Sequence, residues 1–165
     1  MAKILLVIVT LFISIISLSA QETGTSIQIP SIDVHSQIVN APLSKALQTW
    51  DVSHLRNNVG HMEYTPWFGN NGNIVLGAHS VASDGSWDVF YELDGVAVGD
   101  EIIINDNGAT YIYEVTETTT VGFEDTSIIL SREGQTLTLI TCDPASDNGS
   151  NFYSRRHVVF AVRKG

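Results

Sequence analysis

The chain has 165 residues and a globular composition, with 44% hydrophobic and 16% charged residues. This length corresponds to one domain that is large enough to bury a hydrophobic core. The formal net charge of −10 argues against a nucleic-acid partner, because proteins that bind phosphate backbones present basic surfaces. The chain has a single cysteine, Cys142, so an internal disulfide bond is excluded.

The N-terminal segment is typical of an export signal. Lys3 precedes an uncharged run of apolar or small residues over residues 4–20, which is long for a signal-peptide core and short for a membrane-spanning helix. We therefore expect residues 1–20 to be a signal peptide or an N-terminal membrane anchor, followed by a linker over residues 21–25. Both alternatives place the domain over residues 26–165 outside the cytoplasm, either secreted or at the cell surface. The membrane is a partner only if residues 4–20 are not cleaved.

The remaining chain shows roughly seven or eight short strand patterns, few helical patterns and no alternation of strand with helix. The clearest feature is a hairpin in which a turn over residues 105–108 joins strands over residues 101–104 and 109–115, because Asn and Gly adopt the positive φ angles of tight turns. Buried strands are predicted over residues 73–79 and 136–141. The sequence favours an all-β fold, a closed barrel with one or two short helices.

Cys142 follows the apolar strand over residues 136–141 and precedes Asp143 and Pro144. Proline cannot continue a hydrogen-bonded ladder, so the strand ends here and the cysteine lies beside a polar loop over residues 143–154. Two interpretations stay open on this position alone. The thiol is either buried and inert, as many free cysteines are, or a nucleophile.

A nucleophilic cysteine needs a nearby base or positive charge, because its unperturbed pKa of about 8.5 leaves little thiolate at neutral pH. His79 is the strongest candidate among five histidines, since it ends the most apolar strand and opens into a turn. His61, in a glycine-rich loop predicted over residues 57–73, is the second choice. Acyl transfer also needs a group that stabilises an oxyanion.

Two adjacent arginines, Arg155 and Arg156, begin the last predicted strand and are candidates for that group. Neighbouring residues of a strand point to opposite faces of the sheet. Only one of the two arginines can therefore face Cys142.

Taken together, these residues make the chain resemble the sortases, the surface-protein transpeptidases of bacteria. Residues 138–142 (TLITC) are similar to the family's TLxTC motif. Residues 72–79 (GNIVLGAH) are similar to the strand that carries the family's histidine, and residues 156–161 (RHVVFA) to its arginine strand. The resemblance covers residues 26–162. One departure is the order Gly-Ala before the histidine, where many members have Ala-Gly.

The resemblance implies a closed eight-stranded sortase-type β-barrel in which Cys142 is the nucleophile, His79 the acid–base partner and Arg156 the stabiliser of the oxyanion or substrate backbone. Such an enzyme cleaves a C-terminal sorting motif of the LPxTG type in a surface protein through a thioacyl-enzyme. It then transfers the protein to an amine acceptor, a cell-wall precursor or a pilin lysine. No cofactor is implied. Some members bind calcium through loop carboxylates, but this sequence allows no ligands to be assigned.

A catalytically silent barrel that acts as a binding module at the cell surface is the main alternative, and the joint presence of His79, Cys142 and Arg156 argues against it. A papain-like protease would have its cysteine before its histidine, the reverse of this order. An L,D-transpeptidase would show Ser-x-Gly-Cys at the nucleophile, and one cysteine with scattered histidines lacks the ligand spacing of a zinc site. General anchoring and pilus assembly both stay open as roles.

Overall fold

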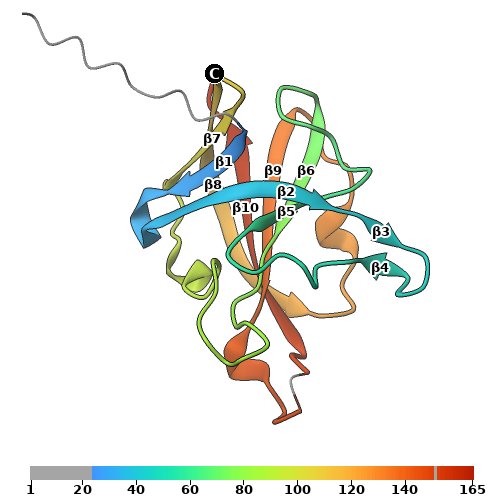
Figure 1. Ribbon diagram of the computed structural model, residues 1–165. Helices are drawn as coiled ribbons and strands as arrows, with labels where there is room; N and C mark the ends of the chain where they lie inside the picture. The colour runs from blue at the N-terminus through green and yellow to red at the C-terminus, as the bar shows by residue number, and fades with distance from the viewer. Residues whose placement is uncertain (1–23, 151) are drawn as a thin grey trace, which may run out of the picture.

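The computed structural model describes residues 24–150 and 152–165, which fold into a closed β-barrel (Figure 1). Eight strands form its wall in the order β1-β2-β5-β6-β9-β10-β8-β7, and pairing of β1 with β7 closes it. A separate two-stranded sheet, β3–β4, projects from the side of the barrel (Figure 1). The predicted all-β fold with a closed eight-stranded barrel is confirmed.

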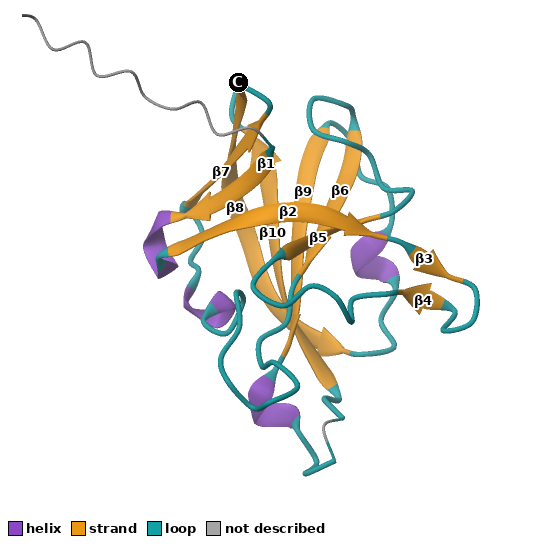
Figure 2. Ribbon diagram, in the orientation of Figure 1, coloured by secondary structure: helices purple, strands orange, loops and turns teal. Residues whose placement is uncertain are grey.

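The described residues form ten strands and four 3-10 helices. The strands are β1 Thr25–Ile29, β2 Val34–Ala41, β3 Leu43–Ser44, β4 Thr49–Trp50, β5 Val59–Met62, β6 Gly72–Gly77, β7 Glu101–Asp106, β8 Ala109–Gly122, β9 Gln135–Cys142 and β10 Arg155–Arg163. The helices, three residues each, are η1 Pro30–Ile32, η2 Leu93–Gly95, η3 Ser127–Ile129 and η4 Pro144–Ser146. They lie outside the barrel wall (Figure 2) and replace the one or two short helices that the sequence predicted.

Several predictions for the N-terminus fall outside the described residues. The export segment over residues 1–20 and the first part of the linker, residues 21–23, are among them. In the part of the chain that the structure describes, no helix has the length and apolar character needed to cross a membrane.

The β7–β8 hairpin forms where the sequence placed it. Asp106 pairs with Ala109, so the turn itself consists of Asn107 and Gly108. Their φ angles of 47° and 94° are both positive, as a tight hairpin turn requires. β7 continues beyond its predicted bound to Asp106, and β8 continues through the threonine-rich run to Gly122, as the strand pattern of that run predicted.

Residues 57–73 contain a strand that the sequence analysis missed, so the loop predicted there is wrong in part. β5 lies parallel to β2 and antiparallel to β6. At Gly60, an added Cβ would lie 2.6 Å from Leu55 Cδ1 and 2.9 Å from Ala41 Cβ, so the close packing of this wall needs glycine. A four-residue strand that contains glycine gives almost no alternating apolar pattern, which explains the omission.

Strands β9 and β10 are buried on both faces. Leu139 and Val159 belong to the main core cluster. Val158 and Phe160, on the opposite face of β10, pack against Ile128 of η3 in a second cluster. The segment between β8 and β9 therefore covers the outer face of the barrel at these strands. The groove between this segment and the strands has apolar walls.

Asn73 holds this covering segment in place. Its side chain is 2% exposed and donates from Nδ2 to the carbonyl oxygens of Ile128 and Leu130, both at 3.1 Å. Its Oδ1 accepts a hydrogen bond from Thr138 Oγ1 at 2.7 Å. One buried amide on β6 thus connects β9 to the segment that covers it.

Replacement of Asn73 by Ala should lower the free energy of unfolding by about 2–4 kcal/mol, because it leaves buried carbonyl and hydroxyl groups without partners. Urea denaturation measures the loss. Asn70→Ala is the matched control, since Asn70 is exposed and makes one bond, to Trp67 O. Equal losses in the two variants would contradict the role assigned to Asn73.

Candidate active site

The ends of three neighbouring strands bring the predicted residues into one row. β6 and β9 are parallel with an offset of 63 residues, as in the pair of Gly77 and Ile140. Two residues further along, the same register aligns His79 with Cys142. On the other side of β9, Arg156 pairs directly with Cys142. The cysteine therefore lies between the histidine and the arginine.

All three side chains line one pocket of about 350 Å³. Most of its other walls are apolar and come from the β4 region, from β5, β6 and β9, and from the segment after β8. These apolar residues are Trp50, Val52, Met62, Val75, Phe123, Ile128, Ile129 and Ile140. The pocket is large enough for a small number of side chains of a peptide, and its polar lining includes the thiol, the imidazole and the guanidinium.

His79 is held from two sides. Its Nε2 lies 2.8 Å from the carbonyl oxygen of Val52. The preceding residue, Ala78, donates its N–H to Ile140 O at 3.3 Å and accepts from Thr141 Oγ1 at 2.9 Å. Because a carbonyl oxygen only accepts hydrogen bonds, Nε2 carries a proton in both charge states of the ring. Nδ1 is left as the nitrogen that takes up or releases a proton.

The Cys142 thiol is half-buried, and two opposing effects act on its pKa. Burial raises the pKa, and the positive charge of Arg156 lowers it in part. The guanidinium is fixed by two backbone acceptors, Tyr153 O at 2.7 Å and Arg155 O at 2.9 Å from its Nη1. A fixed cation beside the thiol favours the thiolate and any negative charge that develops next to it.

Arg155 points away from this pocket, as strand alternation requires. Its Nε donates to Asp143 Oδ2 at 2.8 Å, and the Asp143 side chain is 5% exposed. Asp143 Oδ1 also lies 3.4 Å from Nε2 of His157. The sequence analysis treated Asp143 only as part of a strand end. The signal it did not use is the position of a carboxylate directly after Cys142 and of an arginine directly before Arg156.

The second-choice histidine lies elsewhere. His61 belongs to β5, and its Nε2 contacts Pro66 O at 2.9 Å and Thr65 Oγ1 at 3.2 Å. Burial lowers its pKa. His61 does not line the pocket that contains Cys142.

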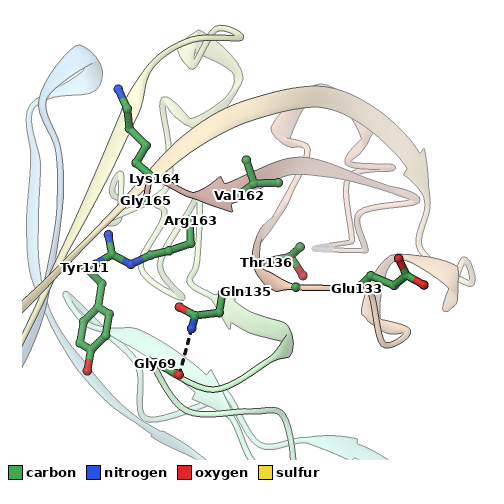
Figure 3. Close-up of a pocket in the computed structure, with 10 residues that line it drawn as sticks. Gly69, Tyr111, Glu133, Gln135, Thr136, Val162, Arg163, Lys164 and Gly165 are labelled. Carbon is green, nitrogen blue, oxygen red and sulfur yellow. Dashed lines mark hydrogen bonds between the residues drawn. The ribbon is translucent and has the colours of Figure 1, made fainter.

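A larger hollow of about 620 Å³ lies at the opposite end of the barrel, beside the C-terminal end of β10 (Figure 3). Several of its polar side chains already bond to the protein. Arg163 donates to Ile112 O and extends toward Tyr111, and Gln135 donates to Gly69 O (Figure 3). The smaller pocket around the thiol is therefore the better candidate for chemistry.

Metal binding was left unassigned from the sequence. Across residues 24–150 and 152–165, no group of three or more His, Cys, Asp or Glu side chains is placed to hold a metal ion.

Comparison with known proteins identifies the family. A Sortase domain model matches residues 27–164. The chain belongs to the sortase family. Sortase D of Bacillus subtilis (strain 168) is 30% identical over 146 residues, which cover 86% of this chain and 66% of the relative. Sortase A of Bacillus anthracis is 26% identical over 143 residues, which cover 87% of this chain and 60% of that relative. The chain thus spans less than two thirds of each of these relatives.

Solved sortase structures have the same barrel. A lid mutant of sortase A from Corynebacterium diphtheriae matches with a TM-score of 0.69 and 28% identity, over 91% of this chain and 74% of that one. Sortase C-1 of Actinomyces oris matches with a TM-score of 0.69 and 29% identity, over 86% of this chain and 73% of that one. A sortase D5 transpeptidase of Clostridium perfringens matches with a TM-score of 0.64 and 29% identity, over 87% of this chain and 80% of that one. The resemblance predicted from the sequence is confirmed.

Replacement of Arg156 by Ala should raise the pKa of the Cys142 thiol, because the variant keeps the burial and loses the cation that opposes it. Less thiolate is then present near neutral pH, so alkylation by iodoacetamide should slow, by about tenfold for each pKa unit gained. The pH dependence of the alkylation rate gives the pKa directly. Arg56→Ala, which removes an exposed arginine, is the control, and an unchanged profile in Arg156→Ala would contradict the electrostatic role.

Proposed function

We propose that this protein is a sortase-type cysteine transpeptidase that cleaves a C-terminal sorting motif of a surface protein and transfers the protein to an amine. The observation that supports the proposal most strongly is the row of His79, Cys142 and Arg156 at the end of an apolar pocket. A nucleophile, a base and a fixed cation in adjacent positions are the groups that acyl transfer requires.

In the first step, Cys142 Sγ attacks the carbonyl carbon of the scissile peptide bond and forms a C–S bond. The thiol proton passes to Nδ1 of His79, and the negative charge on the carbonyl oxygen is stabilised by Arg156. His79 then returns the proton to the leaving nitrogen as the C–N bond breaks. The products of this step are a thioacyl-enzyme and the released C-terminal fragment with a free amine.

In the second step, an acceptor amine attacks the thioester carbon. Its proton goes to Nδ1 of His79, a new C–N bond forms, and the C–S bond breaks. The sulfur leaves with the negative charge, which Arg156 stabilises, and recovers its proton from His79. Splitting one difficult exchange into two easier steps is the advantage of covalent catalysis.

The pocket and the family both support the proposed substrate. Apolar walls from Trp50, Val75 and Ile129 suit an extended peptide with an apolar side chain, consistent with a motif of the LPxTG type. The acceptor is an amine of a cell-wall precursor or of a pilin lysine. Residues 4–20 supply the export signal or anchor that places this reaction at the cell surface. The proposed chemistry uses side chains alone.

A peptide library with variable sorting motifs, incubated with an amine acceptor and analysed by mass spectrometry, tests the activity. The expected result is cleavage of one motif class with transfer of its N-terminal part to the acceptor. Cys142→Ala should abolish both products, because no other described residue supplies a thiol. Binding of peptides without cleavage by the wild-type protein would instead support the silent-barrel alternative.

The two histidines should differ sharply. His79→Ala should lower kcat by about 100-fold or more, because it removes the group that transfers protons in both steps. His61→Ala should change kcat per folded molecule by no more than about threefold, since His61 lies outside the pocket. Steady-state kinetics corrected for the folded fraction compare the two. The reverse ranking would assign the proton transfer to His61.

A further inference from the structure

We propose that Asp143 is a positioning residue that clamps Arg155 and thereby holds Arg156 opposite the Cys142 thiol. The proposal deepens the proposed function and rests on it. Nothing in the reaction touches Asp143 itself. Its effect is to decide which face of β10 is presented to the thiol.

Asp143 makes three hydrogen bonds, two of which connect the end of β9 to the start of β10. Its backbone N–H donates to Arg155 O at 3.1 Å, and its Oδ2 accepts from Arg155 Nε at 2.8 Å. Its Oδ1 accepts from the N–H of Ala145 at 2.9 Å, at the start of η4. The residue is 3% exposed, so the carboxylate end of these bonds is shielded from solvent, while the Arg155 side chain is half exposed.

Two further bonds, made by Ser146, fix the loop that supplies the acceptors of Arg156. Ser146 Oγ donates to Asp143 O at 2.7 Å and accepts from the N–H of Arg155 at 3.1 Å. Both ends of the loop are thus tied to each other. Tyr153 O and Arg155 O, which hold the guanidinium of Arg156, lie at the end of this loop. If the loop shifts, the acceptors of Arg156 shift with it.

The face of β10 that carries Arg155, opposite to the face of Arg156, makes a second contact to the Asp143 carboxylate. His157 Nε2 lies 3.4 Å from Asp143 Oδ1, and its Nδ1 lies 3.0 Å from Thr120 Oγ1 on β8. Arg155 and His157, on either side of Arg156 in sequence, are therefore both directed to Asp143. Because side chains alternate along a strand, holding these two on one face commits Arg156 to the other.

The burial of Asp143 makes the clamp selective. A carboxylate removed from water is costly unless it is paired, so arrangements of β10 that separate Arg155 from Asp143 are disfavoured. An exposed ion pair would not have this effect, because solvent replaces the lost partner at little cost. The free-energy cost of leaving the buried Asp143 carboxylate unpaired therefore favours the orientation of β10 in which Arg155 contacts Asp143.

The substitution Asp143→Asn tests the proposal through the thiol, with no substrate needed. The charged or titratable groups around Cys142 are Arg156, His79 and Asp125, which line its pocket, together with Tyr153 and the adjacent Asp143. If Asp143 positions Arg156, Asp143→Asn should raise the pKa of Cys142 toward that of Arg156→Ala, and alkylation near neutral pH should slow. Direct loss of a neighbouring negative charge would have the opposite sign, lowering the pKa and speeding alkylation.

Kinetics on the full chain give a second readout. Asp143→Asn and Arg155→Ala should each lower kcat by about tenfold with little change in KM, and the double variant should lose no more than the stronger single variant. The side chain of Arg155 is 51% exposed. Arg155→Ala is therefore expected to fold even if a substitution at the buried Asp143 prevents folding. Glu101→Gln is the matched control, since it weakens an exposed pair with Lys164 and should leave kcat unchanged.

A lowered or unchanged thiol pKa in both Asp143→Asn and Arg155→Ala would overturn the proposal. So would losses of kcat that add fully in the double variant, because independent effects are additive. A wild-type protein that cleaves no peptide but shows the predicted shifts in alkylation would refute the proposed function and leave the positioning role intact. The two claims therefore fail separately.

Discussion

Strands β6 and β9 run parallel and share six paired positions, from Gly72 with Gln135 to Gly77 with Ile140. The position of His79 beside Cys142 depends on this pairing. A slip of one residue would direct the thiol to the other face of the sheet, because side chains alternate along a strand. The register is held by core side chains on one face of β9, and by the hydrogen bond from Thr138 to the buried amide of Asn73. The placement of the candidate residues at the strand ends is thus a consequence of packing further inside the barrel.

The two faces of β10 contact different groups at the site. Arg156 faces the pocket, where it opposes the effect of burial on the pKa of Cys142. Arg155 and His157 face a buried carboxylate, Asp143, and fix the strand. We propose that the first face tunes the reactivity of the Cys142 thiol and that the second sets the position of Arg156. Both depend on the same alternation, so a change on one face is expected to affect the other.

Much of this site could be predicted from the sequence because local patterns encode it. The separation of 63 residues between His79 and Cys142 equals the register offset of β6 and β9. Long-range contacts gave no such signal. The bond from His79 to the carbonyl of Val52 joins segments that have no shared pattern. The short strand β5 was missed for a similar reason, since its stability comes from neighbours on both sides rather than from its own composition.

Mapping of the acyl group tests the central claim most directly. The wild-type chain is mixed with a cleavable sorting-motif peptide, quenched in acid, digested and sequenced by tandem mass spectrometry. We expect the N-terminal part of the peptide on Cys142 as a thioester, which disappears when an amine acceptor is added and the transfer product forms. Formation of that product while Cys142 stays unmodified, or an acyl group on another residue, would contradict it.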